Sequence, residues 1–327
     1  MKKLLLGNEA IARGAYEAGV RVSSAYPGTP STEINENVAT YPEIYSEWAP
    51  NEKVAVEVAL GAAVSGARSL ACMKHVGLNV AADPFFTATY TGVNAGMVVV
   101  VADDPGMHSS QNEQDTRMLA RASHAPVLDP SNSQECKDFL KLAYEISEKY
   151  DTPVILRVTT RIAHARTLVE LDERVEVPLR EYKRDIKKYV SMPANMIARH
   201  LYVEEREKKL AEDANTLPIN RIEWADRKIG VITSGAAYNY VKEAMPTASV
   251  LKLGLAYPMP RKLIEEFAAG VDTLYVIEDM VGSIADSRPI RKLPFGIYDF
   301  IRTVSQKEFC VYFPCRTGNY LFGIQFL

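Results

Sequence analysis

Cysteine is scarce in this chain of 327 residues, and its four cysteines are scattered: Cys72, Cys136, Cys310 and Cys315. None of them forms a Cys-x-x-Cys pair, the spacing typical of zinc sites and iron–sulfur clusters. We therefore expect free thiols in a reducing cytoplasm, and no metal ligand among the candidate site residues.

Long hydrophobic runs and an excess of charge of either sign are also missing. The longest apolar runs, such as 97–102, have the length of a strand and cannot cross a bilayer. The apolar start at 4–6 is interrupted by Gly7-Asn8-Glu9, so we expect no export signal. A net charge of -3 provides no basic field for nucleic acid or anionic lipid. Neither nucleic acid nor a membrane is an expected partner.

The chain is longer than one hydrophobic core usually grows, which predicts two domains. Up to about residue 160, helical patterns alternate with short strands rich in Val, Ile, Leu and Ala. This alternation predicts α/β architecture, with a parallel sheet covered on both faces. Strands are expected at 20–25, 43–48, 69–73, 97–102, 125–128 and 153–158, and helices at 9–17, 31–39, 51–66, 76–89, 112–121 and 133–150.

Residues 161–218 break this rhythm. Pro178, Pro193 and Pro218 punctuate the segment, and a charge-laden helix over 195–214 has the profile of a surface connection. A second α/β unit then begins, and we place the boundary near residue 220. Its expected strands are 228–233, 248–253 and 273–278, and its expected helices are 236–244 and 261–269.

The stretch "SAYPGTPSTE" (24–33) follows a predicted strand, and open parallel sheets bind ligands at the carboxyl ends of their strands. Two prolines stiffen the loop, Gly28 leaves space, and Thr29 gains a fixed hydroxyl group. The backbone N–H groups of Ser31 and Thr32 open a helix whose positive end attracts a carboxylate or phosphate. A tight turn with a helix cap explains the same residues, so both interpretations stay open.

Further polar residues follow neighbouring strands. Glu52 lies in the first turn of a predicted helix, where a carboxylate commonly serves the helix dipole. Glu57, in the apolar body of that helix, is a rival candidate that would need a partner if buried. Lys74 and His75 end another strand and should lie at the same sheet edge as Thr29, although such a histidine is more often structural.

The loop 103–115 is long and polar, and loops at strand ends often carry function. Metal binding by Asp103, Asp104 and His108 is one interpretation, but turn and capping roles explain these residue types more simply. Nucleotide-binding glycine motifs are absent from the sequence.

Several long segments, in the same order, resemble the 2-oxoacid:ferredoxin oxidoreductase family, and within it the alpha subunits of indolepyruvate:ferredoxin oxidoreductases. Together they span about residues 3–280. The segments are "LLLGNEAIARGAYEAGV", "SAYPGTPSTEI", "NEKVAVEVALGAAVSGARS", "MKHVGLNVAADP", "VVADDPGMHSSQNEQDTR" and "GVITSGAAYNYVKEA".

The resemblance implies two open parallel-sheet domains. Residues 1–160 look like a thiamine-pyrimidine-binding domain, 161–219 like a linker with a charged helix, and 220–280 like a transketolase-C-terminal-like domain. The tail 281–327 is atypical, because it ceases to resemble the family.

Members of this family use thiamine diphosphate to decarboxylate a 2-oxoacid oxidatively, form an acyl-CoA and pass electrons through iron–sulfur clusters to ferredoxin. By motif position, Glu52 is the glutamate that hydrogen-bonds the pyrimidine ring, as a catalytic and cofactor-binding residue. Lys74 and His75 match a segment close to the cofactor. Thr29 matches a position that contacts the 2-oxoacid carboxylate, with Gly28 and Ser31 in the same substrate-binding loop.

Gly28 also bears on the substrate, because pyruvate-using relatives carry a branched apolar residue there. A glycine enlarges the pocket and fits an aryl pyruvate such as indolepyruvate or phenylpyruvate. A pyruvate- or 2-oxoglutarate-specific relative is the disfavoured alternative.

Full-length relatives continue into a diphosphate-binding domain with a Gly-Asp-Gly motif and often a ferredoxin-like cysteine cluster, and this sequence has neither. Magnesium, the diphosphate contacts and iron–sulfur clusters are therefore expected from absent portions, a beta subunit or a diphosphate-domain polypeptide. We expect the chain to work in an oligomer with coenzyme A and ferredoxin, and to be inactive alone. A non-catalytic binding or assembly module is the remaining alternative.

Overall fold

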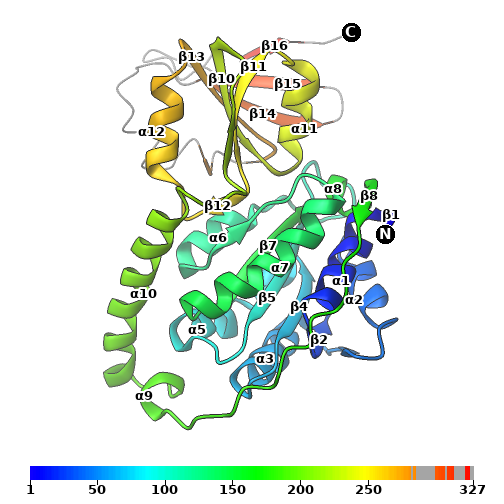
Figure 1. The fold of residues 1–327 in the computed structure, drawn as a ribbon, viewed down its shortest axis with the longest axis vertical. Coiled ribbons are helices and arrows are strands. Elements are labelled where there is room, and N and C mark those ends of the chain that lie inside the picture. The colour runs from blue at the N-terminus through cyan, green and yellow to red at the C-terminus, as the bar shows by residue number, and fades with distance from the viewer. Residues whose placement is uncertain (281–282, 285–298, 306–307, 313–320, 325–327) are drawn as a thin grey trace.

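The computed structural model describes residues 1–280, 283–284, 299–305, 308–312 and 321–324. They form two seven-stranded sheets, with strand orders β12-β6-β7-β5-β4-β2-β3 and β16-β15-β14-β13-β10-β11-β9. Figure 1 shows the first sheet and its helices in the lower part of the molecule and the second sheet above it. Most of the predicted atypical tail, including Cys315, lies outside the described residues.

Six parallel strands form most of the first sheet, and the central strands β4, β5 and β7 are buried at every residue. In β4, Leu70 and Cys72 face one hydrophobic cluster while Ala71 and Met73 face the other. The parallel strands are β2 (Val22–Ala25), β3 (Tyr45–Trp48), β4 (Ser69–Lys74), β5 (Met97–Asp103), β6 (Val127–Leu128) and β7 (Val154–Thr159).

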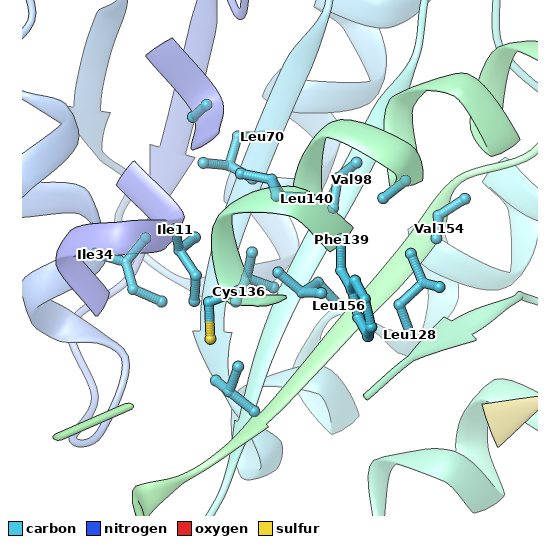
Figure 2. Close-up of a cluster of buried hydrophobic side chains, with 14 of the residues drawn as sticks. Ile11, Ile34, Leu70, Val98, Leu128, Cys136, Phe139, Leu140, Val154 and Leu156 are labelled. Atoms are coloured by element: carbon cyan, nitrogen blue, oxygen red, sulfur yellow. The ribbon is translucent and has the colours of Figure 1, made fainter. Parts of the chain in front are cut away.

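Helices cover both faces of this sheet, and Figure 2 shows Ile11, Ile34 and Leu140 packed over the strand residues on one of them. That face is covered by α1 (Gly7–Glu17), α2 (Thr32–Val38) and α7 (Ser133–Tyr150). The other is covered by α3 (Glu52–Val64), α4 (His75–Val80), α5 (Ala82–Thr91) and α6 (Thr116–Ser123).

Two helix predictions differ from the structure. The expected helix 76–89 is divided into α4 and α5 at Ala81, because Pro84 has no N–H with which to continue the hydrogen-bond ladder. The expected helix 112–121 begins only at Thr116, where the side chain of Asp115 caps it by accepting a hydrogen bond from Arg117 N at 2.9 Å.

The predicted linker begins with elements that pack beside the first sheet. After α8 (Thr160–His164), strand β8 (Arg166–Glu170) pairs antiparallel with β1 (Lys2–Leu6), which the sequence patterns did not indicate. An extended segment then leads to α9 (Ile186–Tyr189) and α10 (Pro193–Asp213), which confirms the predicted charged helix. Among the described residues, no helix is long and apolar enough to span a membrane.

The second sheet carries α11 (Gly235–Ala244) and α12 (Arg261–Ala269). One strand of this part of the chain departs from it: β12 (Leu255–Tyr257) pairs antiparallel with β6 at the edge of the first sheet. The division of the chain near residue 220 therefore stays a prediction, since residues after it contribute to both sheets. The strands are β9 (Arg221–Glu223), β10 (Asp226–Ser234), β11 (Ala248–Leu253), β13 (Thr273–Glu278), β14 (Asp299–Ser305), β15 (Glu308–Tyr312) and β16 (Leu321–Ile324).

A buried ionic network joins the carboxyl ends of strands from the two sheets. Arg157 of β7 is fully buried and donates to Asp103 at 2.7 Å, to Asp129 at 3.1 Å and to Asp279 at 3.2 Å. Burial lowers the pKa of the Arg157 guanidinium, but these carboxylates outweigh burial and raise the pKa well above its ordinary value. Ser234 at the end of β10 donates to Asp129 at 2.8 Å. The network thereby links the carboxyl ends of β6 and β7 to the second sheet, through Asp129 with Ser234 and Arg157 with Asp279.

Candidate functional site

The loop after β2 is closed by its own hydrogen bonds. Gly28 N donates to Thr32 Oγ1 at 2.9 Å, while Ser31 donates its hydroxyl and its N–H to the Gly28 carbonyl at 2.7 and 2.8 Å. The expectation that the Ser31 N–H is free for an anion is therefore wrong: Ser31 is buried and shapes the loop. Thr29, by contrast, is exposed at the tip.

Lys74 connects this loop to the loop after β5. A Cβ atom at Gly28 would lie 3.2 Å from Lys74 Cβ, so the glycine lets the loop approach the lysine side chain closely. Lys74 is only 7% exposed and donates its Nζ to the Ser109 carbonyl at 2.7 Å. Three segments, from β2, β4 and β5, thus meet at one sheet edge.

His75 is 2% exposed, and its Nε2 lies 3.1 Å from the Asn112 carbonyl oxygen. Because a carbonyl oxygen only accepts, this contact assigns the proton to Nε2 and leaves Nδ1 as an acceptor. Nδ1 is buried without a partner among the described residues. An unsatisfied buried acceptor costs about 1–3 kcal/mol, so a donor from a ligand or water fits this position.

Glu52 is the first residue of α3, whose start is fixed by the Asn51 side chain accepting a hydrogen bond from Val54 N at 3.0 Å. The half-buried Glu52 side chain lies over Gly77 of α4, where an added Cβ would come within 2.7 Å of Glu52 Cδ. The start of the helix is thus fixed by its cap, and the carboxylate has no hydrogen-bond or ion-pair partner among the described residues.

The rival candidate, Glu57, would need a partner only if it were buried, and it is not buried. Its side chain is 49% exposed, and its ion-pair contact with Lys53 spans 4.0 Å. A solvated carboxylate needs no partner, so nothing in its surroundings marks Glu57 as functional.

The candidate residues converge on the carboxyl ends of adjacent strands. Glu52 contacts Gly77, which lies one helical turn beyond Lys74, and Lys74 contacts Gly28 beside Thr29. Glu52 and Thr29 therefore share one edge of the first sheet. Reasoning from sequence missed Gly77 as a contact, although this glycine stands in the quoted "MKHVGLNVAADP" segment.

The metal interpretation of the 103–115 loop finds no support in the contacts. Asp103 pairs with Arg157, and Asp104 accepts hydrogen bonds from Ser110 and Thr160. Within the described parts of the chain, no group of three or more His, Cys, Asp or Glu side chains could hold a metal ion.

The chain is similar to known proteins in both sequence and fold. Residues 13–219 match the family described as "Pyruvate flavodoxin/ferredoxin oxidoreductase, thiamine diP-bdg". The indolepyruvate oxidoreductase subunit IorA of Pyrococcus horikoshii is 47% identical over 294 residues, which are 85% of this chain and 45% of that subunit. The chain thus spans less than half the length of the curated relatives that it matches.

Two solved structures are similar in fold. The 2-oxoglutarate:ferredoxin oxidoreductase from Magnetococcus marinus, with 2-oxoglutarate, coenzyme A and succinyl-CoA bound, has a TM-score of 0.73 at 20% identity and covers 87% of this chain and 59% of its own. An inactive split-gene transketolase tetramer has a TM-score of 0.55 at 16% identity, over 91% of this chain and 88% of its own. These similarities confirm the predicted α/β architecture with two sheet units, although the second sheet is mixed, because β9, β15 and β16 each pair antiparallel with a neighbour.

The family match covers more than half of the chain and includes the loop after β2, the start of α3 and the ends of β4 and β5. It shows that the chain belongs to the pyruvate flavodoxin/ferredoxin oxidoreductase family, in its thiamine-diphosphate-binding part.

Proposed function

We propose that this chain forms the pyrimidine side of a thiamine diphosphate site in an indolepyruvate-type 2-oxoacid:ferredoxin oxidoreductase. The observation that carries the proposal is the open carboxylate of Glu52, held against Gly77 at the sheet edge that also bears Thr29 and Lys74. The relatives named as indolepyruvate oxidoreductase subunits support the indolepyruvate type.

The donors and acceptors present fit a pyrimidine ring. A ring nitrogen needs a carboxyl group at a fixed position, which the capped first turn of α3 provides for Glu52. The unpartnered Nδ1 of His75 can accept a hydrogen bond from an amino group. When bound there, thiamine diphosphate would supply a nucleophilic thiazolium carbon for the decarboxylation of a 2-oxoacid. The part of Glu52 is to share a proton with the ring, and such proton transfer depends on geometry before pKa.

Thr29 and Lys74 suit the carboxylate of a 2-oxoacid. Thr29 is exposed at the tip of the loop, and the stem of the Lys74 side chain lies against Gly28 of the same loop. Ser31 contributes by holding the loop closed. Gly28 lets the loop lie against Lys74 without a side chain of its own, and a position without a side chain would favour an aryl group on the substrate.

Gly28→Ile should depress turnover of aryl substrates selectively. A Cβ at Gly28 would lie 3.2 Å from Lys74 Cβ, so the isoleucine side chain must displace Lys74 or the loop itself, and steric changes of this kind alter kcat/KM by about tenfold or more. We expect ferredoxin reduction with indolepyruvate to fall while the rate with pyruvate is largely kept. Gly61→Ile is the matched control, because a Cβ at Gly61 meets nothing within 4 Å. Equal losses with both substrates would contradict the assignment.

The parts of the enzyme that bind the diphosphate and carry the electrons would come from another polypeptide or from a further part of the same protein. We propose that a beta subunit and a diphosphate-domain polypeptide supply the diphosphate and magnesium contacts, the iron–sulfur clusters and the route to ferredoxin, with coenzyme A as acyl acceptor. The free, buried thiols of Cys72 and Cys136 agree with a cytoplasmic location.

Co-expression with these partners tests the proposal. The complex should reduce ferredoxin in the presence of an aryl pyruvate and coenzyme A, whereas the chain alone should not. A correctly assembled complex that is inactive on every 2-oxoacid would instead favour a non-catalytic assembly module.

A further inference from the structure

The loop between β5 and α6, residues 104–115, supplies the backbone carbonyls that hold two of the candidate site residues. The Ser109 carbonyl accepts from Lys74 Nζ at 2.7 Å, and the Asn112 carbonyl accepts from His75 Nε2 at 3.1 Å. The position of this loop therefore fixes where the lysine charge lies and which nitrogen of the histidine carries the proton.

One buried carboxylate ties the start of this loop to its middle and to α8. Asp104 has no exposed surface; its Oδ2 accepts from Ser109 N at 2.8 Å and from Ser110 Oγ at 2.5 Å, and its Oδ1 accepts from Thr160 Oγ1 at 2.7 Å. Burial raises the pKa of the Asp104 carboxyl, but the hydrogen bonds, led by those from Ser110 and Thr160, outweigh burial and lower the pKa to about 2. The anchor is thus ionised at neutral pH.

The neighbouring aspartate has a different partner. Asp103 accepts from Arg157 at 2.7 Å, which links it to the junction with the second sheet, and it accepts from Thr116 N at 3.2 Å, where the loop enters α6. Asp104 makes its contacts on the loop and on α8. Of the two adjacent carboxylates at the end of β5, Asp103 thus contacts the junction between the sheets and Asp104 contacts the loop beside the candidate site.

We propose that Asp104 is a positioning residue of this site, which sets Lys74 and the proton of His75 through the 104–115 loop. Its consequence for ligand binding rests on the proposed function. Asp104 itself touches no candidate ligand-binding side chain, and it acts through the carbonyls of Ser109 and Asn112.

Asp104→Asn in the full chain tests this role without any ligand. The amide group cannot accept from all three donors, so backbone amides of 105–114 should exchange hydrogen faster by about tenfold or more, as expected for losing hydrogen bonds to a charged group. ¹⁵N NMR of the imidazole, assigned with a His75→Gln variant, should show loss of the single Nε2–H tautomer. Ser110→Ala keeps the carboxylate and should give a smaller change in the same direction, which preserves the test if Asp104→Asn fails to fold.

Asp83→Asn is the matched control, because Asp83 is exposed and, among the residues that the structure describes, forms an ion pair only with Lys53, at 3.3 Å. Unchanged loop exchange and an unchanged His75 tautomer in Asp104→Asn and Ser110→Ala would overturn the proposal. In the co-expressed complex, Asp104→Asn should also raise the thiamine diphosphate concentration needed for half-maximal activity. A loosened loop and altered His75 without that rise would support the anchor role and contradict the proposed cofactor site.

Discussion

Glu52→Gln in the co-expressed complex should lower kcat for 2-oxoacid-dependent ferredoxin reduction by about 10²–10⁴-fold, the range typical for loss of a positioned acid–base group. The amide is isosteric but cannot share a proton with a ring nitrogen as a carboxyl group does. Stability should fall by no more than about 1 kcal/mol, the usual size of a helix-dipole interaction in the first turn. Steady-state kinetics and urea unfolding measure the two effects.

Glu57→Gln, on the same helix but solvent-exposed, should keep wild-type activity. Gly77→Ala gives an independent route to the same effect, because the added methyl group overlaps the Glu52 carboxyl group and moves it without changing its chemistry. Full activity of Glu52→Gln, or an equal loss in Glu57→Gln, would contradict the assignment of Glu52.

Arg157→Met should destabilise the chain by about 3–5 kcal/mol, the cost typical of removing one partner from a buried ionic network. The substitution leaves Asp103, Asp129 and Asp279 buried without their shared cation. Urea unfolding followed by tryptophan fluorescence measures the loss. Trp48 lies in β3 of the first sheet, and the Trp224 ring lies tilted against Phe267 of α12 with the ring centroids 5.4 Å apart, so each tryptophan reports on one sheet.

Arg161→Met provides the comparison, because Arg161 is exposed, and such surface changes usually stay within about 0.5 kcal/mol. If the junction holds the sheets together, the Trp224 signal should change at lower urea than the Trp48 signal in Arg157→Met. A loss below about 1 kcal/mol would show that the network contributes little beyond replaceable packing.

The parallel strands were predictable because each is a short, continuous apolar run that can be recognised in the sequence without knowledge of its partners. Runs such as Met97–Ala102 are apolar on every residue, which only burial on both faces explains, and the Ser133–Tyr150 helix matched its predicted bounds. Strands β1, β8 and β12 were not predictable, since each is short and is stabilised by a partner distant in the sequence. Their sequences carry no periodicity that distinguishes them from loops.

The site was predictable to the level of the sheet edge. Polar residues after consecutive strands placed Thr29, Lys74 and His75 together, because carboxyl ends of parallel strands share an edge. The engagement of the Ser31 N–H within its own loop and the contact of Glu52 with Gly77 depend on side-chain and backbone positions that no local pattern encodes.

Hydrogen exchange of the assembled complex, with and without thiamine diphosphate, tests most directly whether this edge holds the cofactor ring. The account predicts that the cofactor slows exchange at the start of α3 around Glu52 and in the segment from Lys74 to Gly77. Protection confined to other parts of this chain, in a complex shown to bind the cofactor, would contradict it.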